Sequence, residues 1–415
     1  MALTDIHPRT PVRSLLRDYT DKELAYTFSV DLVAAAVGMQ PEFVRRVLGL
    51  RSPIVKLGDV FTLLDQDAYS ETFVPRSLVP TFLVQSLERR PENTSTLRLD
   101  DYRHLLVHGD AKELLQQLPH HSVNCVVTST PYWGMRLYEQ HIETTWADNE
   151  TCAFGHEQTP EGFIRHSIEL LYYLKKALAE DGSIWWNLMD TYNTRTQIRA
   201  NASETLKAMN GRDSRGWGDH ACRRYSAGHS YLSDGEQCVI PSRVAERASR
   251  IGYWVKSIIY WKKENSMPET VETRVTREAE TIIHLSLQRA PYLDKEAYRI
   301  LPKSLGGRNP KFESDKVTDV WCLATATGMD GHGAQFPLAL PARCIALSTR
   351  ENDLVCDPFM GSGTTSVAAE KLNRRSVGFD ISTEYLDIAR KRLAKNGHNG
   401  HEPSGFEQPF QPSMF

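Results

Sequence analysis

The sequence predicts an α/β protein with a mostly parallel sheet, helices on both faces of that sheet, and a small helical module in front of it. Apolar strand patterns and amphipathic helix patterns alternate from Tyr102 to Lys395, and this alternation is typical of parallel sheets. Residues 1–100 instead have mainly helical patterns, and the polar stretch from Glu88 to Asp101 separates the two parts. A length of 415 residues allows two domains of this kind.

Composition limits the class of protein. The chain carries 49 Lys and Arg against 52 Asp and Glu, a formal net charge of −3. It has no apolar run near the roughly 18 residues that a membrane span needs, and residues 1–13 lack the apolar centre of a signal peptide. We therefore expect a soluble, cytoplasmic protein. The seven cysteines form no CxxC pair, and the spacing of His220, Cys222, His229 and Cys238 matches no common zinc pattern, so we expect neither disulfides nor a metal.

Residues 1–100 are expected to form the helical module. The segment from Ser29 to Leu50 indicates two short helices around a turn near Gly38. Counted from Val30, a small residue, a glycine and an apolar residue stand at the fifth, ninth and fifteenth places, which is the pattern of a helix-turn-helix. Arg45, Arg46 and Arg51 lie on or beside the second helix. Contact with DNA is one interpretation, and a packing or dimerisation domain is the other.

The main domain is expected over residues 101–396. Its strands are predicted from short apolar runs and its helices from a 3.6-residue apolar period, the second helix ending at Gly182. In chain order we expect strands over 104–110, 123–128, 183–188, 254–263, 280–287, 353–357 and 375–380, and helices over 111–118, 161–182, 241–252, 337–349, 366–372 and 382–395.

Two segments interrupt this pattern. Residues 190–238 are rich in Asn, Ser, Gly and Arg, and residues 289–335 carry several Lys and Arg without helical or strand periodicity. Such long irregular segments are typical of functional loops or inserted recognition elements. Residues 195–250 carry 10 Lys and Arg against 6 Asp and Glu, so both segments are predicted to contact DNA, with Arg223 and Arg224 as candidate phosphate contacts. A pair of solvated loops is the alternative. Residues 397–415 are Gly-, Pro- and Gln-rich and are predicted to be disordered.

The turn after the strand at 353–357 is a candidate nucleoside-binding site. Gly361 and Gly363 allow the backbone to approach a ligand closely, and Asp380 at the end of the next strand can accept both hydroxyls of a ribose. The segment lacks the third glycine of a dinucleotide fingerprint and the Gly-Lys-Ser/Thr of a phosphate loop. A Phe before the glycines suits an uncharged nucleoside with a sulfonium, and S-adenosylmethionine is the natural candidate.

The segment from Thr128 to Gly134, TSTPYWG, also follows a predicted strand. An exocyclic amine of a nucleobase is a poor nucleophile, and hydrogen-bond acceptors that hold both of its hydrogens favour attack on a methyl group. Ser129 offers a hydroxyl, the proline-stiffened turn can aim the Thr130 carbonyl, and Tyr132 offers a flat face to an extruded base. Taken alone, the segment favours a tight turn anchored by a half-buried aromatic residue over this catalytic role.

Together, the two motifs resemble one family, the amino-directed DNA methyltransferases of the β arrangement, in which the catalytic motif precedes the cofactor motif. STPYW corresponds to the family's Ser-Pro-Pro-Tyr motif, and DPFMGSGTT with GFD to its methionine- and ribose-binding segment. HGAQFPLALPARCI (332–345) corresponds to the segment just upstream. One departure is Thr130, which stands where the family has its first proline. The resemblance covers about residues 102–395 and implies a Rossmann-like, S-adenosylmethionine-dependent methyltransferase fold.

The resemblance also implies roles for individual residues. Ser129, Thr130 through its carbonyl, Pro131 and Tyr132 would hold and activate the base. The cofactor would be held by Asp110, Phe336, Pro337, Asp357, Phe359, Gly361, Ser362, Gly363, Thr364 and Asp380.

The base that is methylated depends on position 129. Family members with Ser there usually modify the exocyclic N4 of cytosine, and those with Asp or Asn usually modify N6 of adenine, so cytosine is favoured. Methylation at ring carbon 5 needs a cysteine nucleophile, typically in a Pro-Cys turn, and the sequence contains no Pro-Cys. Double-stranded DNA is the implied partner, and a homodimer or a companion restriction endonuclease is left open. The alternatives are adenine-N6 methylation, an RNA substrate, and a DNA-binding regulator with an inactive catalytic half.

Overall fold

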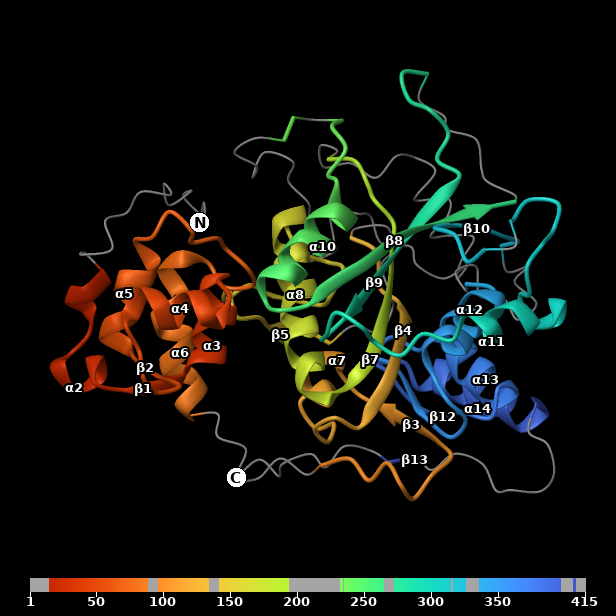
Figure 1. The fold of residues 1–415 in the computed structure, drawn as a ribbon, viewed down its shortest axis with the longest axis horizontal. Coiled ribbons are helices and arrows are strands. Elements are labelled where there is room, and N and C mark those ends of the chain that lie inside the picture. Colours follow the sequence, from red (N-terminus) through yellow and green to blue (C-terminus); the bar gives the residue numbers. More distant parts are fainter. Residues whose placement is uncertain are drawn as a thin grey trace, which may run out of the picture.

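The computed structural model describes residues 15–88, 96–133, 142–193, 232–233, 235–264, 272–314, 316–325, 336–396 and 406–407. At its centre is a nine-stranded sheet in the order β10-β8-β9-β7-β4-β11-β12-β3-β13 (Figure 1). Only β9 runs antiparallel to its neighbours β7 and β8, so the prediction of a mostly parallel sheet is confirmed. The strands are β3 (His104–His108), β4 (Val123–Ser129), β7 (Leu178–Leu188), β8 (Trp254–Lys263), β9 (Ala279–Ser286), β10 (Val320–Leu323), β11 (Leu354–Asp357), β12 (Arg375–Asp380) and β13 (Phe406–Glu407).

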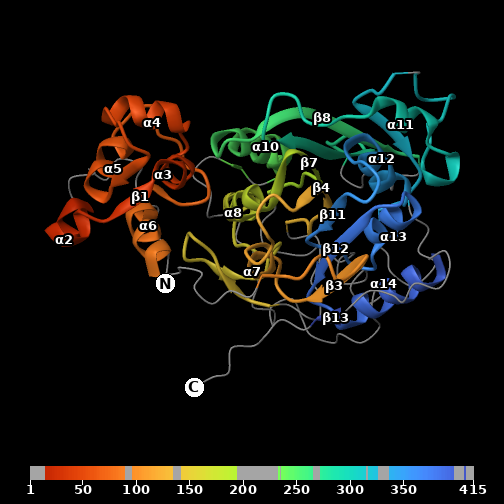
Figure 2. The same cartoon turned by 60° about the horizontal axis from the view of Figure 1, so that its bottom comes forward.

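Helices cover both faces of this sheet. One face carries α7 (Ala111–Leu115), α8 (Pro160–Ala177) and α10 (Ile240–Arg250), and the other carries α11 (Lys295–Ile300), α12 (Ala339–Ser348) and α13 (Thr364–Lys371), with α14 (Thr383–Asn396) against α13 (Figures 1 and 2). Strand β7 shows why both faces are apolar. Ile184, Trp186 and Leu188 belong to the core under α8, whereas Trp185 belongs to the core under α12. Successive residues of a strand point to opposite faces, so a strand covered on both sides is apolar throughout.

The largest difference from the predicted boundaries is at the end of α8. The helix expected over 161–182 ends at Ala177, and β7 begins at Leu178. Leu178 is buried and pairs with Val123 of β4, so tertiary packing continues the strand backwards past the position that local periodicity favoured. Gly182 does not end the helix. It lies within β7, where an added Cβ would come within 2.9 Å of the Asn124 carbonyl oxygen.

Parts of the two segments predicted to be irregular lie outside the described residues, including Arg223, Arg224 and the candidate ligands His220, Cys222 and His229. The segment 289–335 is more regular than predicted. It contains α11, a short 3-10 helix, η5 (Lys303–Leu305), and edge strand β10, which pairs with β8 in parallel. Arg343 and Glu313 form a buried bidentate ion pair that ties this segment to α12. Two residues of the tail predicted to be disordered form β13 beside β3.

The N-terminal module is a compact group of short helices and a two-stranded antiparallel sheet. Its elements are η1 (Leu16–Asp18), α2 (Asp21–Leu24), β1 (Thr27–Ser29), α3 (Val30–Val37), α4 (Pro41–Leu48), β2 (Ile54–Lys56), α5 (Leu57–Leu64), η2 (Arg76–Leu78) and α6 (Val79–Glu88). The two predicted short helices are α3 and α4. Gly38 ends α3 with φ of +68°, and an added Cβ would lie 2.1 Å from the Ser70 carbonyl oxygen, so the turn requires glycine.

The module packs against α8 and α10 of the main domain (Figure 1). Phe73 stacks on Tyr172 of α8 with ring centroids 5.1 Å apart. Glu71 pairs with Arg165 of α8 at 3.1 Å, and Arg247 of α10 donates to the Thr72 carbonyl. The buried apolar residues of the module and those under α8 belong to one hydrophobic core, so the two parts form one packed unit.

Candidate active site

The segment predicted to be catalytic begins where β4 ends, near the centre of the sheet. Ser129 is the last residue of β4, and Thr130, Pro131 and Tyr132 follow it. Trp133 fixes the far end of this turn, because its buried indole donates to the Glu157 carbonyl at 2.9 Å. Gly155 packs against the turn with φ of +92°, and an added Cβ would lie 3.1 Å from the Cβ of Pro131. Contacts with Glu157 and Gly155 therefore hold the turn from Thr130 to Trp133 in place.

Four side chains meet at this strand end. The Ser129 and Tyr132 hydroxyls are 3.1 Å apart, and Tyr132 donates a short hydrogen bond to the Glu280 carboxylate. Asn187, near the end of β7, directs its amide nitrogen at all three, with 3.2 Å to Ser129 Oγ and 2.8 Å each to Tyr132 and Glu280. Lys263, at the end of β8, balances the carboxylate with its ammonium 2.6 Å from Glu280 Oε1. The predicted pair Ser129 and Tyr132 is thus part of a buried, charged network.

Sequence reasoning missed Asn187, Glu280 and Lys263. A signal for Glu280 was present, because a carboxylate begins the otherwise apolar strand ETIIHLS and becomes buried with 6% exposure. Charged residues are rarely buried unless they are paired. The sequence could not show its partners, because Ser129 and Glu280 are brought together only by the sheet order β4-β7-β9.

The backbone carbonyl of Thr130 is the acceptor that the sequence analysis assigns to the target amine. The residue is buried with 4% exposure, and its carbonyl accepts no backbone hydrogen bond among the described residues. Asn187 Oδ1 is also buried and lacks a partner in the described part of the chain. Because buried acceptors are costly to leave unsatisfied, these oxygens suit a ligand that donates hydrogen bonds.

The glycine turn lies beside this network, at the end of β11. Phe359 packs on Phe154 with centroids 5.2 Å apart, and Gly361 and Gly363 have φ of +49° and +80°. An added Cβ at Gly363 would lie 2.7 Å from Ala389 of α14, whereas one at Gly361 would meet nothing within 4 Å. Gly363 is therefore required for packing, and Gly361 faces open space.

Asp357 stabilises the site through buried hydrogen bonds. Its carboxylate is 1% exposed and accepts hydrogen bonds from Thr128 at 2.7 Å, Thr365 at 2.6 Å and the Phe359 amide at 3.1 Å. Burial raises the pKa of Asp357 to about 6. Since Thr128 precedes Ser129 directly, Asp357 ties the end of β4 to the glycine turn.

Asp380 lies at the end of β12, next to the glycine turn. Its Oδ2 accepts the Gly361 amide at 2.9 Å and its Oδ1 accepts the Ser382 amide at 2.8 Å, so each oxygen retains a lone pair. Burial raises its pKa to about 6. Asp110 is nearby, because the Gly109 amide donates to the Asp380 carbonyl. Asp110 caps α7 through Oδ1, and burial raises its pKa also.

Four further predicted residues lie at the edge of this region. Arg392 of α14 donates to the carbonyl and hydroxyl of Ser362 and to the Thr364 hydroxyl, so both side chains brace the turn against α14. Phe336 and Pro337 are partly buried just before α12, and Phe336 packs on the core beneath that helix. The structure therefore shows a packing role for Phe336.

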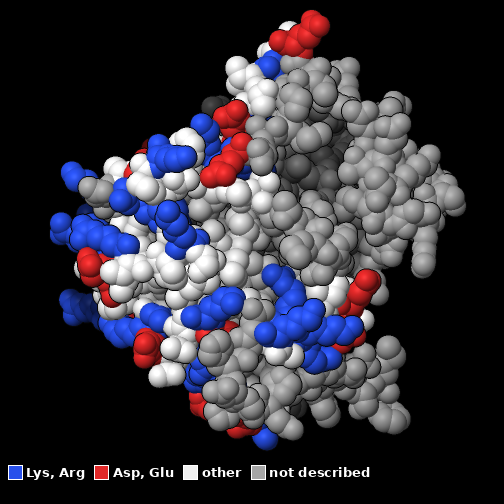
Figure 3. Space-filling view, turned by 90° about the vertical axis from the view of Figure 1, so that its right-hand side faces the viewer, with Lys and Arg blue, Asp and Glu red and all other residues white. Residues whose placement is uncertain are grey.

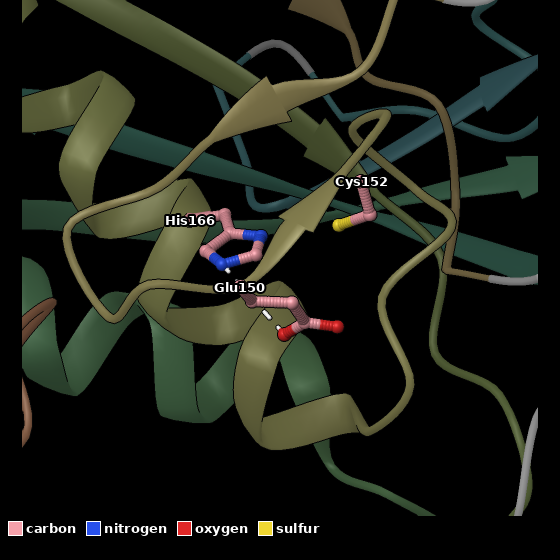
Figure 4. A group of neighbouring side chains, drawn as sticks. All are labelled: Glu150, Cys152 and His166. Atoms are coloured by element: carbon pink, nitrogen blue, oxygen red, sulfur yellow. Dashed lines mark ion pairs between the residues drawn. The ribbon is translucent and has the colours of Figure 1, made fainter.

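Glu150, Cys152 and His166 cluster outside this region, where β6 (Thr151–Cys152) faces His166 of α8 (Figure 4), with ligand-type atoms within 4.8 Å of one another. Both nitrogens of His166 already contact carboxylates, Glu157 at 3.1 Å and Asp148 at 3.1 Å, which raise the pKa of His166 to about 9 against the opposing effect of burial. A protonated imidazole has no lone pair for a metal. We therefore interpret the cluster as an ion-pair network that supports the segment under Pro131.

Comparisons with known proteins agree with this arrangement. A family model described as DNA methylase matches residues 123–391. Type II methyltransferase M.Cfr9I of Citrobacter freundii is 33% identical over 292 residues, covering 69% of this chain and 87% of that protein. Type II methyltransferase M.SmaI of Serratia marcescens is 29% identical over 297 residues, covering 70% and 90%. The chain therefore belongs to the N4/N6 family of DNA methyltransferases.

Solved structures with a similar fold include the PvuII cytosine-N4-specific DNA methyltransferase, which has a TM-score of 0.49 and 19% identity and covers 70% of this chain and 88% of that one. Another is M1.HpyAVI in complex with S-adenosylmethionine, with a TM-score of 0.41 and 20% identity over 70% and 98% of the two chains. No helix in the described part of the chain is long and apolar enough to cross a membrane.

Proposed function

We propose that this protein transfers the methyl group of S-adenosylmethionine to the exocyclic N4 of a cytosine extruded from double-stranded DNA, as the modification enzyme of a type II system. One observation carries the proposal most directly. Ser129 ends the strand β4, Thr130 follows with a carbonyl that accepts no backbone hydrogen bond among the described residues, and Asp357 ties that strand to the turn proposed to hold the cofactor. The two reactants would then meet at adjacent strand ends.

The residues present fit S-adenosylmethionine. Asp380 retains two acceptor lone pairs for the ribose hydroxyls, and the backbone at Gly361 faces open space that a side chain would occupy. Asp110 offers Oδ2, which accepts no hydrogen bond among the described residues. When bound, the cofactor supplies a methyl group on a positively charged sulfur.

The chain's own residues position and activate the base. Tyr132 stacks on the extruded ring, and Ser129 Oγ and the Thr130 carbonyl accept the two amine hydrogens. Holding both hydrogens concentrates the nitrogen lone pair toward the methyl group and away from the ring. Ser at position 129 favours cytosine over adenine, which remains the alternative substrate.

The test is expression of the protein in a host without DNA modification, followed by single-molecule sequencing of that host's DNA. We expect N4-methylcytosine at one short recurring sequence. N6-methyladenine instead would establish the alternative substrate. A Ser129→Ala, Tyr132→Ala double variant is the control, and it should leave the DNA unmodified. Absence of any methylation, together with no S-adenosylmethionine binding by calorimetry, would refute the proposed activity.

The N-terminal module is proposed to bind the same DNA through α4. Six of the eight residues of α3 are buried, but only Val44 of α4 is, so α3 supports the pair and α4 is presented to solvent, as in a helix-turn-helix. Arg46, Arg51 and Lys56 are exposed, and the Arg45 side chain is 42% exposed. Glu42 is the one acidic residue among residues 40–56. This surface is complementary in charge to a phosphate backbone.

Replacing Arg46 and Arg51 together with alanine should weaken DNA binding and reduce the slope of log K against log salt by roughly 2, if both side chains contact phosphates. Fluorescence anisotropy at several salt concentrations measures this slope. Lys22→Ala on α2 is the control, because Lys22 is exposed and lies on another helix. An unchanged slope in a folded double variant would leave the module with only its packing role against α8 and α10.

The segment 289–335 is proposed to add a second basic surface. Figure 3 faces the side of the molecule on which α11, α13 and α14 lie, and Lys and Arg cover more of it than Asp and Glu do. The exposed basic residues of α11 and the following segment are Lys295, Arg299, Lys303, Lys311 and Lys316. We propose that this surface and the segment containing Arg223 and Arg224 contact the DNA around the extruded base.

A further inference from the structure

We infer that Glu280 determines the direction of the hydrogen bonds that connect Ser129, Tyr132 and Asn187, and thereby makes Ser129 an acceptor toward the target amine. The inference rests on the proposed function and assigns Glu280 as a positioning residue of the same site. A hydrogen-bond network connects Glu280 with Ser129, Tyr132 and Asn187.

An ionised carboxylate can only accept hydrogen bonds, whereas hydroxyl groups both donate and accept. Lys263 forms an ion pair with Glu280, with its ammonium 2.6 Å from Glu280 Oε1. Tyr132 has a single proton, which its short contact with Glu280 Oε2 must use. Tyr132 therefore cannot donate to Ser129, and across their 3.1 Å contact Ser129 must be the donor.

Asn187 reinforces this direction. Its amide nitrogen lies 2.8 Å from Glu280 Oε2, which requires that this atom be the nitrogen and not the oxygen, since two acceptors would repel. The same nitrogen lies 3.2 Å from Ser129 Oγ, to which it can only donate. The two hydrogens of this amide are shared among three acceptors, and the contacts with Tyr132 and Glu280 at 2.8 Å are shorter than the contact with Ser129. Since the nitrogen cannot accept, the Ser129 proton goes to Tyr132.

The Ser129 hydroxyl therefore has no proton to offer a ligand and keeps at least one lone pair. A group that enters the pocket at Ser129 must then be a hydrogen-bond donor. The N4 amine of cytosine satisfies this requirement, whereas the carbonyl that uracil has at the same ring position is an acceptor and would face the Ser129 lone pair. Glu280 therefore enforces recognition of an amine without contacting the base.

Glu280→Gln tests this inference, because glutamine keeps the size of the side chain but can donate as well as accept, so the hydrogen-bond direction is no longer imposed. The first readout is binding, at the target sequence mapped by sequencing, of DNA with cytosine or with uracil at the methylated position, in the presence of S-adenosylhomocysteine. The parent protein should prefer cytosine, and the variant should lose about tenfold or more of that preference. The cost of the G·U mismatch is common to both proteins and cancels in the ratio.

The second readout compares the change in kcat with the change in affinity for S-adenosylmethionine. In Glu280→Gln, kcat should fall about 10- to 100-fold, the range expected for a hydrogen bond to a charged group, while the affinity for S-adenosylmethionine should stay within about twofold. Glu278→Gln is the matched control, since Glu278 is exposed, lies two residues away, and contacts only Lys262 at 3.9 Å among the ion pairs of the described residues. It should behave as the parent does.

Tyr132→Phe provides an independent check if Glu280→Gln does not fold. Phenylalanine retains the ring that stacks on the base but removes the hydroxyl that links Ser129 to Glu280. The cytosine preference should decrease in this variant also, and adding Glu280→Gln to it should have little further effect. A parent-like preference in a folded Glu280→Gln or Tyr132→Phe protein would overturn the inference, whereas a parent protein that methylates no DNA would instead overturn the proposed function.

Discussion

Replacing Asp380 with alanine should weaken S-adenosylmethionine binding by roughly 30- to 1,000-fold, which corresponds to the loss of about 2–4 kcal/mol from two charge-assisted hydrogen bonds to the ribose. The carboxylate is suited to this role because each oxygen accepts one backbone amide and retains a lone pair. Isothermal titration calorimetry measures the change. An affinity equal to that of the parent would remove Asp380 from the proposed cofactor site.

Asp380→Asn is the matched variant, because it keeps the size of the side chain but not its charge. It also isolates a pH effect. Since the pKa of Asp380 is raised to about 6, the ionised form that binds the ribose hydroxyls is lost as pH falls through that value. Cofactor affinity should therefore decrease below about pH 6 in the parent and depend less on pH in Asp380→Asn. Circular dichroism of both variants separates this effect from unfolding of the glycine turn.

Replacing Tyr132 with alanine should reduce turnover by roughly 5- to 150-fold, since stacking of a base on an aromatic ring contributes about 1–3 kcal/mol. Cofactor affinity should be unchanged, because the Tyr132 hydroxyl contacts Ser129, Asn187 and Glu280, which belong to the proposed base site. Single-turnover methylation of a DNA duplex measures the rate.

The comparison of Tyr132→Ala with Tyr132→Phe separates the contribution of the Tyr132 ring from that of its hydroxyl. The phenylalanine variant should retain the ring that stacks on the extruded base. DNA with the target base replaced by a fluorescent analogue should therefore report a base extruded from the duplex in the parent and in Tyr132→Phe, and less extrusion in Tyr132→Ala. A Tyr132→Ala protein that methylates DNA at the parent rate would show that the base does not stack on this ring.

The sequence by itself determined the fold class, the order of the elements and the two motifs at strand ends. These features depend on local chemistry. The apolar period distinguishes strands from helices, and the glycines at 361 and 363 are needed for backbone angles and close packing that other residues disfavour. The bounds of β8 and β12 agree with the residues predicted from periodicity, because nothing in their tertiary environment opposes the local pattern.

The tertiary structure decided where α8 ends and which side chains surround Ser129. Pairing of Leu178 with Val123 converts the last turn of the predicted helix into strand, since the free energy of burial in a sheet exceeds local helix preference. Glu280 is 151 positions from Ser129 in the chain, and its contact with Tyr132 arises because antiparallel β9 places its first residues beside the end of β7. The polarity of the base pocket therefore depends on strand order, which no local pattern in the sequence encodes.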